Sequence, residues 1–118
     1  MTLRRIACIA LLLTLTACVG PQLFQHQLMR LNQGMAPADV TSELKLEPLS
    51  VHDVMASGIH YTFQHYRLNN GMQSATYLLA FQDGKLKYWG YIEDFRRHPD
   101  ARLVEAANSI VPALNAAR

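Results

Sequence analysis

Histidines are the side chains of this chain that could bind a metal ion or transfer protons. Five occur among the 118 residues, and imidazole serves as a metal ligand and as an acid–base group near neutral pH. His60 and His65 fall within one predicted strand, at a spacing that directs them to opposite faces. The pair His52-Asp53 has nothing in the sequence with which to converge. We therefore expect no metal site and no cofactor.

A charged run near the end of the chain could imitate an acid–base pair. It contains Glu93 and Asp94, followed by Arg96, Arg97 and His98. Adjacent residues rarely converge on one substrate, and the chain has neither a Gly-x-Ser-x-Gly elbow nor a glycine-rich phosphate loop. The run is better explained as a solvated connection between a strand and a helix, with anionic lipid headgroups as an alternative contact for its arginines. We expect no catalytic residue and no enzymatic activity.

The first 18 residues have the layout of a secretory signal. Arg4-Arg5 precede an apolar run that begins at Ile6 and is too short to cross a hydrocarbon core of about 30 Å. The run ends in Leu15-Thr16-Ala17-Cys18, which resembles the lipobox of bacterial lipoproteins. The resemblance implies a signal peptide at 1–17 and a lipid attached to Cys18, and an ordinary signal peptide with a chance cysteine is the alternative.

Lipidation would account for both cysteines, because Cys8 leaves with the leader and Cys18 carries the lipid. Acyl chains on Cys18 would anchor the protein in a membrane. Val19 follows that cysteine where an inner-membrane lipoprotein of enteric bacteria would have Asp, which favours the periplasmic face of the outer membrane of a Gram-negative bacterium. The tether at 18–22 is short, so the folded domain is expected to lie against the headgroups.

The composition of the remaining chain excludes further classes. From Cys18 onward, nine Lys and Arg balance nine Asp and Glu, so no basic patch indicates nucleic acid as a partner. Residues 23–118 suffice for one domain with one modest core. The predicted fold class is α+β, with two short N-terminal helices packed on a three-stranded antiparallel meander and an added C-terminal helix.

The helices and the connection after them are predicted from apolar spacing and punctuating residues. Apolar positions over 22–32 follow helical spacing, and Gly34 is suited to end that helix. Pro37 favours the first turn of a second short helix, with an apolar stripe at Ala36, Val40 and Leu44. The stretch 48–58 predicts an irregular connection with room for a short strand.

The meander is predicted from its turns. Asp83-Gly84 is a strong hairpin turn that pairs Phe81 with Leu86 and, further along, Leu79 with Tyr88. A three-residue loop at 69–71 is expected because it brings the apolar residues of the first strand onto the same face. That face then holds Ile59, Tyr61, Phe63, Tyr77, Leu79, Phe81, Leu86 and Tyr88.

On this register Leu78, Trp89 and Tyr91 share the opposite face, which is too apolar to be left in water without a reason. Two interpretations stay open. A C-terminal helix opening at Pro99 covers the face with an apolar stripe over 103–114, and Pro112 kinks or ends that helix. Alternatively the face binds a partner, since Trp and Tyr are common interface anchors.

The order of these features resembles a known family. A lipobox precedes a short helix, the run 31–40 contains Gly34-Met35 followed by Val40, and an aromatic meander follows. This is similar to the SmpA/OmlA (BamE-like) family of small outer-membrane lipoproteins. The resemblance implies two helices on one face of a three-stranded sheet, and contacts with the outer-membrane assembly machinery or another envelope protein. A binding module or inhibitor that captures a soluble periplasmic ligand or enzyme is the alternative function.

Overall fold

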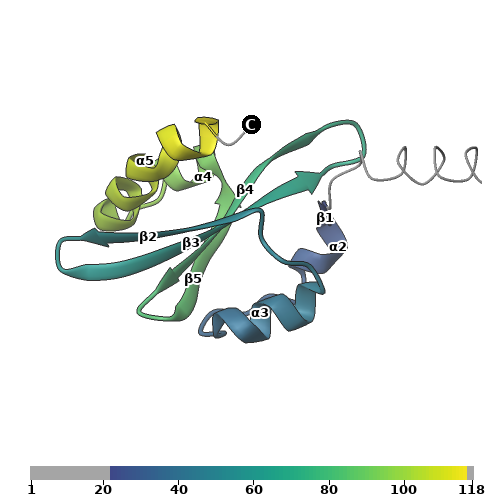
Figure 1. Cartoon of the computed structure of the whole chain (residues 1–118), viewed down its shortest axis with the longest axis horizontal. Helices are drawn as coiled ribbons and strands as arrows, with labels where there is room; N and C mark the ends of the chain where they lie inside the picture. Colours follow the sequence, from purple (N-terminus) through teal and green to yellow (C-terminus); the bar gives the residue numbers. More distant parts are fainter. Residues whose placement is uncertain (1–21, 117–118) are drawn as a thin grey trace, which may run out of the picture.

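A curved sheet of five strands runs through the middle of the computed structural model, with helices against both of its faces (Figure 1). The structure describes residues 22–116, so the predicted signal peptide and the lipobox residues Leu15, Thr16, Ala17 and Cys18 lie outside the described residues. No helix within 22–116 is long and apolar enough to cross a membrane. In chain order the elements are β1 (Leu23–Phe24), α2 (Gln25–Leu28), α3 (Pro37–Leu44), β2 (Ser50–Ala56), β3 (Ile59–Asn69), β4 (Ser74–Gln82), β5 (Lys85–Tyr91), α4 (Ile92–Arg96) and α5 (Ala101–Ala116).

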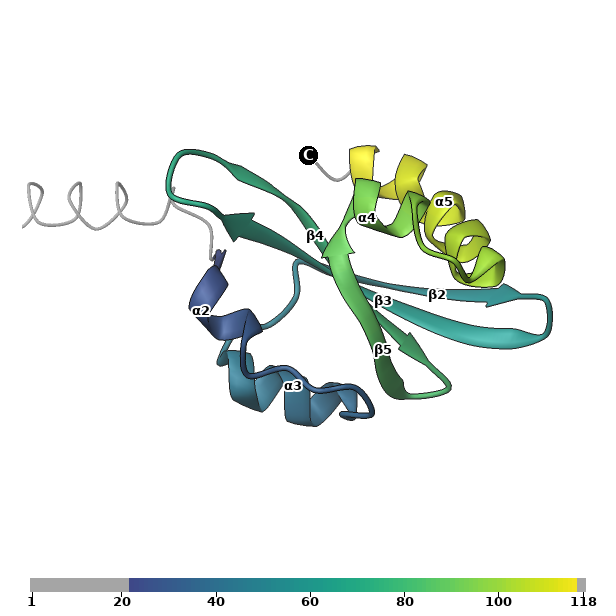
Figure 2. The ribbon, with the colours of Figure 1, turned by 180° about the vertical axis from the view of Figure 1, so that it is seen from behind.

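Strand β3 is the centre of the sheet (Figure 2). On one edge it pairs with β4 in antiparallel orientation from Tyr61 to Asn69, and β4 pairs in turn with β5. On its other edge β3 pairs with antiparallel β2 and, at its last residues, with parallel β1 through Leu68 and Asn69. The predicted α+β class with an antiparallel-rich sheet and a C-terminal helix is confirmed.

The N-terminal helices close a first core on one face of the sheet. Pro37 opens α3 at its first turn, as expected, and Val40 and Leu44 of that helix are buried against β4 residues such as Leu79 and Phe81. These apolar contacts supply most of the stability of so short a helix. The buried members of this first core are Leu23, Leu28, Leu31, Val40, Leu44, Tyr66, Leu68, Tyr77, Leu79, Phe81 and Leu86.

The C-terminal helices close a second core on the other face. The predicted apolar stripe of α5 is buried there, and the helix runs past Pro112 to Ala116 instead of ending at the proline. Phe95 of α4 packs edge-on against Phe63 and Tyr88. The buried members of this second core are Ala56, Tyr61, Phe63, Leu78, Ala80, Phe95, Leu103, Ala106, Ala107, Ile110 and Leu114.

Two of the predicted elements differ from the observed ones. The helix expected over 22–32 is confined to α2, because Leu23 and Phe24 extend to pair with β3 as β1. The connection expected over 48–58 is the full strand β2, which pairs with β3 over its whole length. This stretch forms a strand because it pairs with the long β3, although its own side chains alternate only weakly between apolar and polar.

The predicted register of the first hairpin is wrong. Tyr61 pairs with Gln82 and Asn69 with Ser74, so the turn has four residues, Asn70–Gln73, and not three. Tyr61 and Phe63 consequently lie in the second core, on the face opposite Phe81. The predicted register placed all the apolar residues of this strand on one face, whereas helices bury both faces, so burial alone does not select between the two registers.

A bulge changes the second hairpin. Phe81 pairs with Leu86 as expected, but the register shifts between Ala80 and Phe81 so that Leu79 lies opposite Trp89 instead of Tyr88. A bulge places two residues against one and turns later side chains to the other face. Trp89 therefore joins the first core and Tyr88 the second.

Loss of the α5 stripe should destabilise the whole domain. Leu103 is fully buried, so Leu103→Ala is expected to lower the free energy of unfolding by about 2–4 kcal/mol through lost contacts and a residual cavity. Asn108→Ala, on the exposed side of the same helix, should change it by less than about 0.5 kcal/mol. Denaturant unfolding measures both, and equal effects of the two substitutions would contradict the second core.

Candidate functional site

The point at which the chain enters the fold is fixed to the end of the β3–β4 hairpin. Leu23 and Phe24 pair with Leu68 and Asn69, and the Asn69 side-chain amide donates to Gln22 Oε1 at 2.9 Å. Leu23 is fully buried in the first core. Gln22, just before β1, is therefore held at the hairpin end of the molecule.

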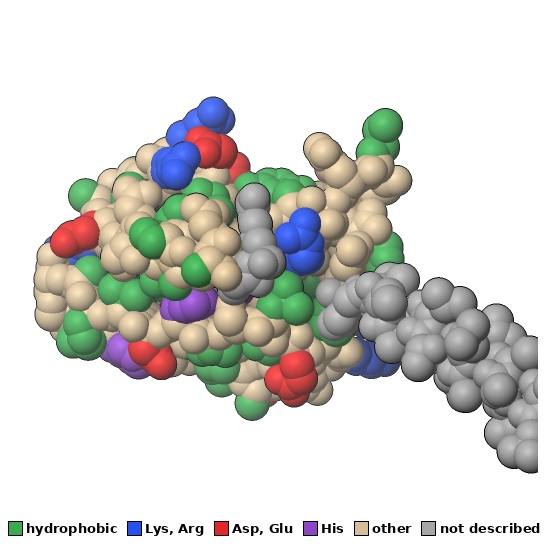
Figure 3. Space-filling view, turned by 45° about the horizontal axis from the view of Figure 1, so that its top comes forward, with side chains coloured by type: hydrophobic (Ala, Val, Ile, Leu, Met, Phe, Trp, Pro, Cys, Tyr) green, Lys and Arg blue, Asp and Glu red, His purple; other side chains and the backbone are tan. Residues whose placement is uncertain are grey.

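Large hydrophobic side chains are exposed around this entry point. Met72, in the β3–β4 turn, is 97% exposed, Met29 just after α2 is 87% exposed, and Phe24 of β1 is 48% exposed. In Figure 3 the hairpin end projects from the body of the molecule with hydrophobic atoms at its outermost point. We call the surface formed by Phe24, Met29 and Met72 the entry-end surface.

The candidate partner face does not exist as a single surface. Leu78 is fully buried in the second core, whereas Trp89 and Tyr91 pack from the other side of the sheet against the first core. Tyr91 meets Tyr77 edge-on with ring centroids 5.1 Å apart. The bulge separates these residues, and each core accounts for its own aromatic side chains.

The motif residues Gly34, Met35 and Val40 attach the N-terminal helices to the sheet. The Gly34 N–H donates to the carbonyl of Leu86 at 2.8 Å, and the Leu86 N–H donates to the carbonyl of Met35 at 2.8 Å. Gly34 has a φ of +91°, a conformation that favours glycine. Gly34 lies in the loop before α3, not at the end of a helix as expected. Val40 is a residue of α3, and its side chain is buried.

Two histidines meet through a serine at the edge of the second face. Ser50 Oγ lies 2.9 Å from His52 Nε2 and 3.2 Å from His65 Nδ1. His65 is buried, and its Nε2 has no hydrogen-bond partner among the described residues. Burial lowers the pKa of His65 below its ordinary value of 6.5, and the nearby His52 and Arg67 lower it further.

His60 lies on the opposite face of the sheet from His65, as predicted. His60 Nε2 is 3.0 Å from Asp53 Oδ1, which also accepts from the Thr62 hydroxyl at 2.8 Å. Within residues 22–116, no three His, Cys, Asp or Glu side chains gather as a metal site. The two histidine clusters therefore form hydrogen bonds with neighbouring side chains of the sheet and do not come together at one site.

The charged run stabilises its own short helix. Asp94 Oδ2 accepts the backbone N–H of Tyr91 at 2.8 Å, and Arg96 donates to Glu93 at 2.6 Å. Asp94 fits because the residue beneath it is Gly90, where a Cβ would approach Asp94 Oδ2 to 2.9 Å. Glu93, Asp94 and Arg96 therefore make contacts within α4 and at its first turn.

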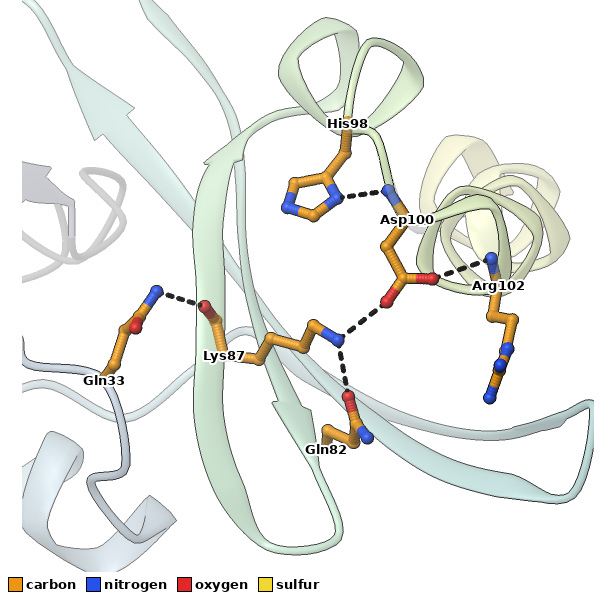
Figure 4. A network of polar contacts seen from close by, with 6 residues as sticks. All are labelled: Gln33, Gln82, Lys87, His98, Asp100 and Arg102. Atoms are coloured by element: carbon orange, nitrogen blue, oxygen red, sulfur yellow. Dashed lines mark hydrogen bonds and ion pairs between the residues drawn. The ribbon is translucent and has the colours of Figure 1, made fainter.

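A second polar network joins β5 to the start of α5 (Figure 4). Lys87 Nζ donates to Asp100 Oδ2 and to Gln82 Oε1, both at 2.7 Å. The hydrogen bond from Lys87 holds the pKa of Asp100 below its ordinary value of 3.8. Asp100 Oδ1 accepts from the N–H of Arg102, and the Asp100 N–H donates to His98 Nδ1. The network fixes the first turn of α5 against the sheet.

Comparisons with known protein families, curated proteins and solved structures give no match to this chain.

An open groove lies between the β3–β4 hairpin and the start of α4. Arg67, Ser74, Glu93 and Asp94 line it, and the Arg67 guanidinium is held by hydrogen bonds to Ser74 at 3.1–3.2 Å. Both signs of charge face the groove, so it does not select an anion.

The outer edge of β2 is a surface that the sequence argument missed. Val51 and Met55 on this strand are 52% and 66% exposed, and Leu49 just before it is 47% exposed. Within the described part of the chain, β2 pairs only with β3, so its outer edge has no strand partner. No sequence signal marked this edge, because the side chains of Val51, His52, Asp53, Val54 and Met55 do not alternate between apolar and polar.

Protonation of His65 should weaken the fold in mildly acidic solution. Its pKa is lowered on folding, so below about pH 6.5 the unfolded chain binds a proton that the folded chain excludes, and stability falls as the pH falls through that window. We expect the free energy of unfolding to drop between about pH 7.5 and about pH 5, and to drop less in His65→Gln. His26→Gln, at an exposed position, is the matched control, and its free energy of unfolding should vary with pH as in the wild type. If the free energy of unfolding of His65→Gln also varied with pH as in the wild type, His65 would not be the group responsible.

Proposed function

We infer that the protein is a lipid-anchored envelope protein that acts through protein contacts at the periplasmic face of the outer membrane, as an accessory to outer-membrane protein assembly. The observation that carries this proposal is the run Leu15-Thr16-Ala17-Cys18 at the end of a short apolar leader. Val19 after the cysteine supports the outer membrane as the destination. The assembly role rests on the resemblance to SmpA/OmlA proteins.

The short tether agrees with this proposal. Three residues, Val19, Gly20 and Pro21, separate Cys18 from Gln22, so four Cα-to-Cα steps join them. Gln22 is hydrogen-bonded to Asn69 of the sheet. A chain of that length spans at most about 14 Å. The domain would therefore work close to the membrane surface, where barrel proteins are inserted.

The β2 edge supports protein contacts as the mode of action. A strand with an unpaired edge can accept an extended segment of another protein through main-chain hydrogen bonds. Val51 and Met55 add apolar side chains beside that edge, and their neighbour Asp53 is already engaged by His60 and Thr62. We propose this edge as the contact for the envelope partner.

The lipid anchor is tested by Cys18→Ala in cells. The variant is expected to move from the membrane fraction to the soluble periplasmic fraction, because a single domain without acyl chains has no comparable anchor. Cys8→Ala, in the leader, should leave sedimentation unchanged. Continued sedimentation of Cys18→Ala with membranes would show that the anchor is assigned to the wrong residue.

The mode of action is tested by photo-crosslinking from position 51 of the full chain in cells. We expect adducts with a membrane-bound assembly component, identified by mass spectrometry, since Val51 lies beside the unpaired edge. Position 108, exposed on α5, is the control and should give fewer adducts. Adducts only with a soluble periplasmic enzyme would favour the inhibitor alternative, and equal adducts from both positions would reject the β2 edge.

A further inference from the structure

We propose that the entry-end surface, formed by Phe24, Met29 and Met72, inserts into the lipid surface as a second membrane contact beside the acyl chains. The inference rests on the proposed lipid anchor at Cys18. It adds a protein surface that fixes how the domain is oriented on the bilayer. Its occupant is the lipid surface itself, and a protein partner at this surface is one of the outcomes that the test separates.

The length of the tether selects the bilayer as the occupant. Acyl chains can enter the hydrocarbon only if Cys18 lies at the headgroup level, and the four Cα-to-Cα steps from there to Gln22 span at most about 14 Å. Gln22 accepts a hydrogen bond from Asn69 at 2.9 Å, and Asn69 is the last residue of β3 before the turn that holds Met72. The hairpin end is thus among the parts of the domain nearest the lipid.

The turn is suited to a poorly hydrated environment because its four backbone N–H groups all have partners within the turn and at Asn69. The Asn70 N–H donates to the carbonyl of Gln73 at 3.1 Å. The Gly71 N–H donates to Asn69 Oδ1 at 2.7 Å, and the N–H groups of Met72 and Gln73 donate to Asn70 Oδ1 at 3.1 and 3.0 Å. Every backbone donor of the four-residue turn is therefore paired. Entry into lipid would leave none of them unsatisfied, and unsatisfied donors are the main cost of placing irregular backbone there.

The charge of these segments also fits a lipid surface. Residues 22–36 and 65–82 contain no Asp or Glu, so no carboxylate on either segment must leave water when the surface inserts. Arg30 follows Met29 and is exposed, where it can face anionic headgroups. Phe24 stacks on His26 with ring centroids 6.1 Å apart, and phenylalanine is among the side chains that interfacial segments bury at the boundary between headgroups and acyl chains.

The test measures how deeply a spin label on Met72 lies in a bilayer. The full-length chain carrying Met72→Cys is produced in cells, purified with its lipid in detergent, and reconstituted into vesicles of phosphatidylethanolamine and phosphatidylglycerol. Cys18 is blocked by lipid, so a nitroxide attaches only at position 72, and the wild-type chain should take up none. Accessibility to apolar oxygen is compared with accessibility to a water-soluble nickel chelate. Met29→Cys is a second probe of the entry-end surface, and Met55→Cys on β2, exposed but distant along β3 from the hairpin end, is the matched control.

We expect the oxygen-to-nickel accessibility ratio to be several-fold higher at positions 72 and 29 than at position 55. Equal ratios, in a protein that still sediments with the vesicles, would overturn the insertion and leave the lipid anchor intact. A soluble chain whose Cys18 takes up nitroxide would overturn both the anchor and the insertion. Labels shielded from oxygen and nickel alike would show a protein contact at this surface, such as a second copy, and would reject lipid as the occupant.

Discussion

Strand β3 must bury both of its faces at once, and the remaining elements are arranged to satisfy that constraint. Alternate side chains feed the two cores, Tyr66 and Leu68 on one side and Tyr61 and Phe63 on the other. Two pairs of helices are therefore needed, one for each face. Without α5 the second face would expose apolar side chains, and without α3 the first face would do the same.

The sequence predicted the elements with strong local signals and failed where the second face decided the outcome. Pro37 and Asp83-Gly84 act through their own backbone preferences, and the helix opened by Pro37 and the hairpin turn were both predicted correctly. The turn at Asn70–Gln73 could not be resolved, because both registers bury an apolar set and differ only in which face receives it. β2 was underestimated because its strand character comes from pairing with β3 and not from its own side chains.

The residues of the candidate site were also hard to predict wherever tertiary contacts decide their position. The bulge between Ala80 and Phe81 separated Leu78 from Trp89, and nothing in the sequence marks its position. The structure shows contacts that adjacent positions in the sequence do not reveal: Ser50 links His52 to His65, and Asp94 accepts the N–H of Tyr91 at the start of α4. The exposed surfaces that remain, the β2 edge and the entry-end surface, depend on which residues the fold leaves uncovered. Only the tertiary structure could identify them.

The way β1 joins the sheet has a mechanical consequence. Any pull transmitted along the tether reaches the domain at Leu23 and Phe24, whose two ladder pairs with β3 are the smallest strand contact in the sheet. Because the ladder hydrogen bonds run across the strands, tension along β1 loads those few bonds together in shear. Their rupture would draw Leu23, which is fully buried, out of the first core. The fold should thus yield first beneath α2 under load, while the second core and the β2 edge keep their structure.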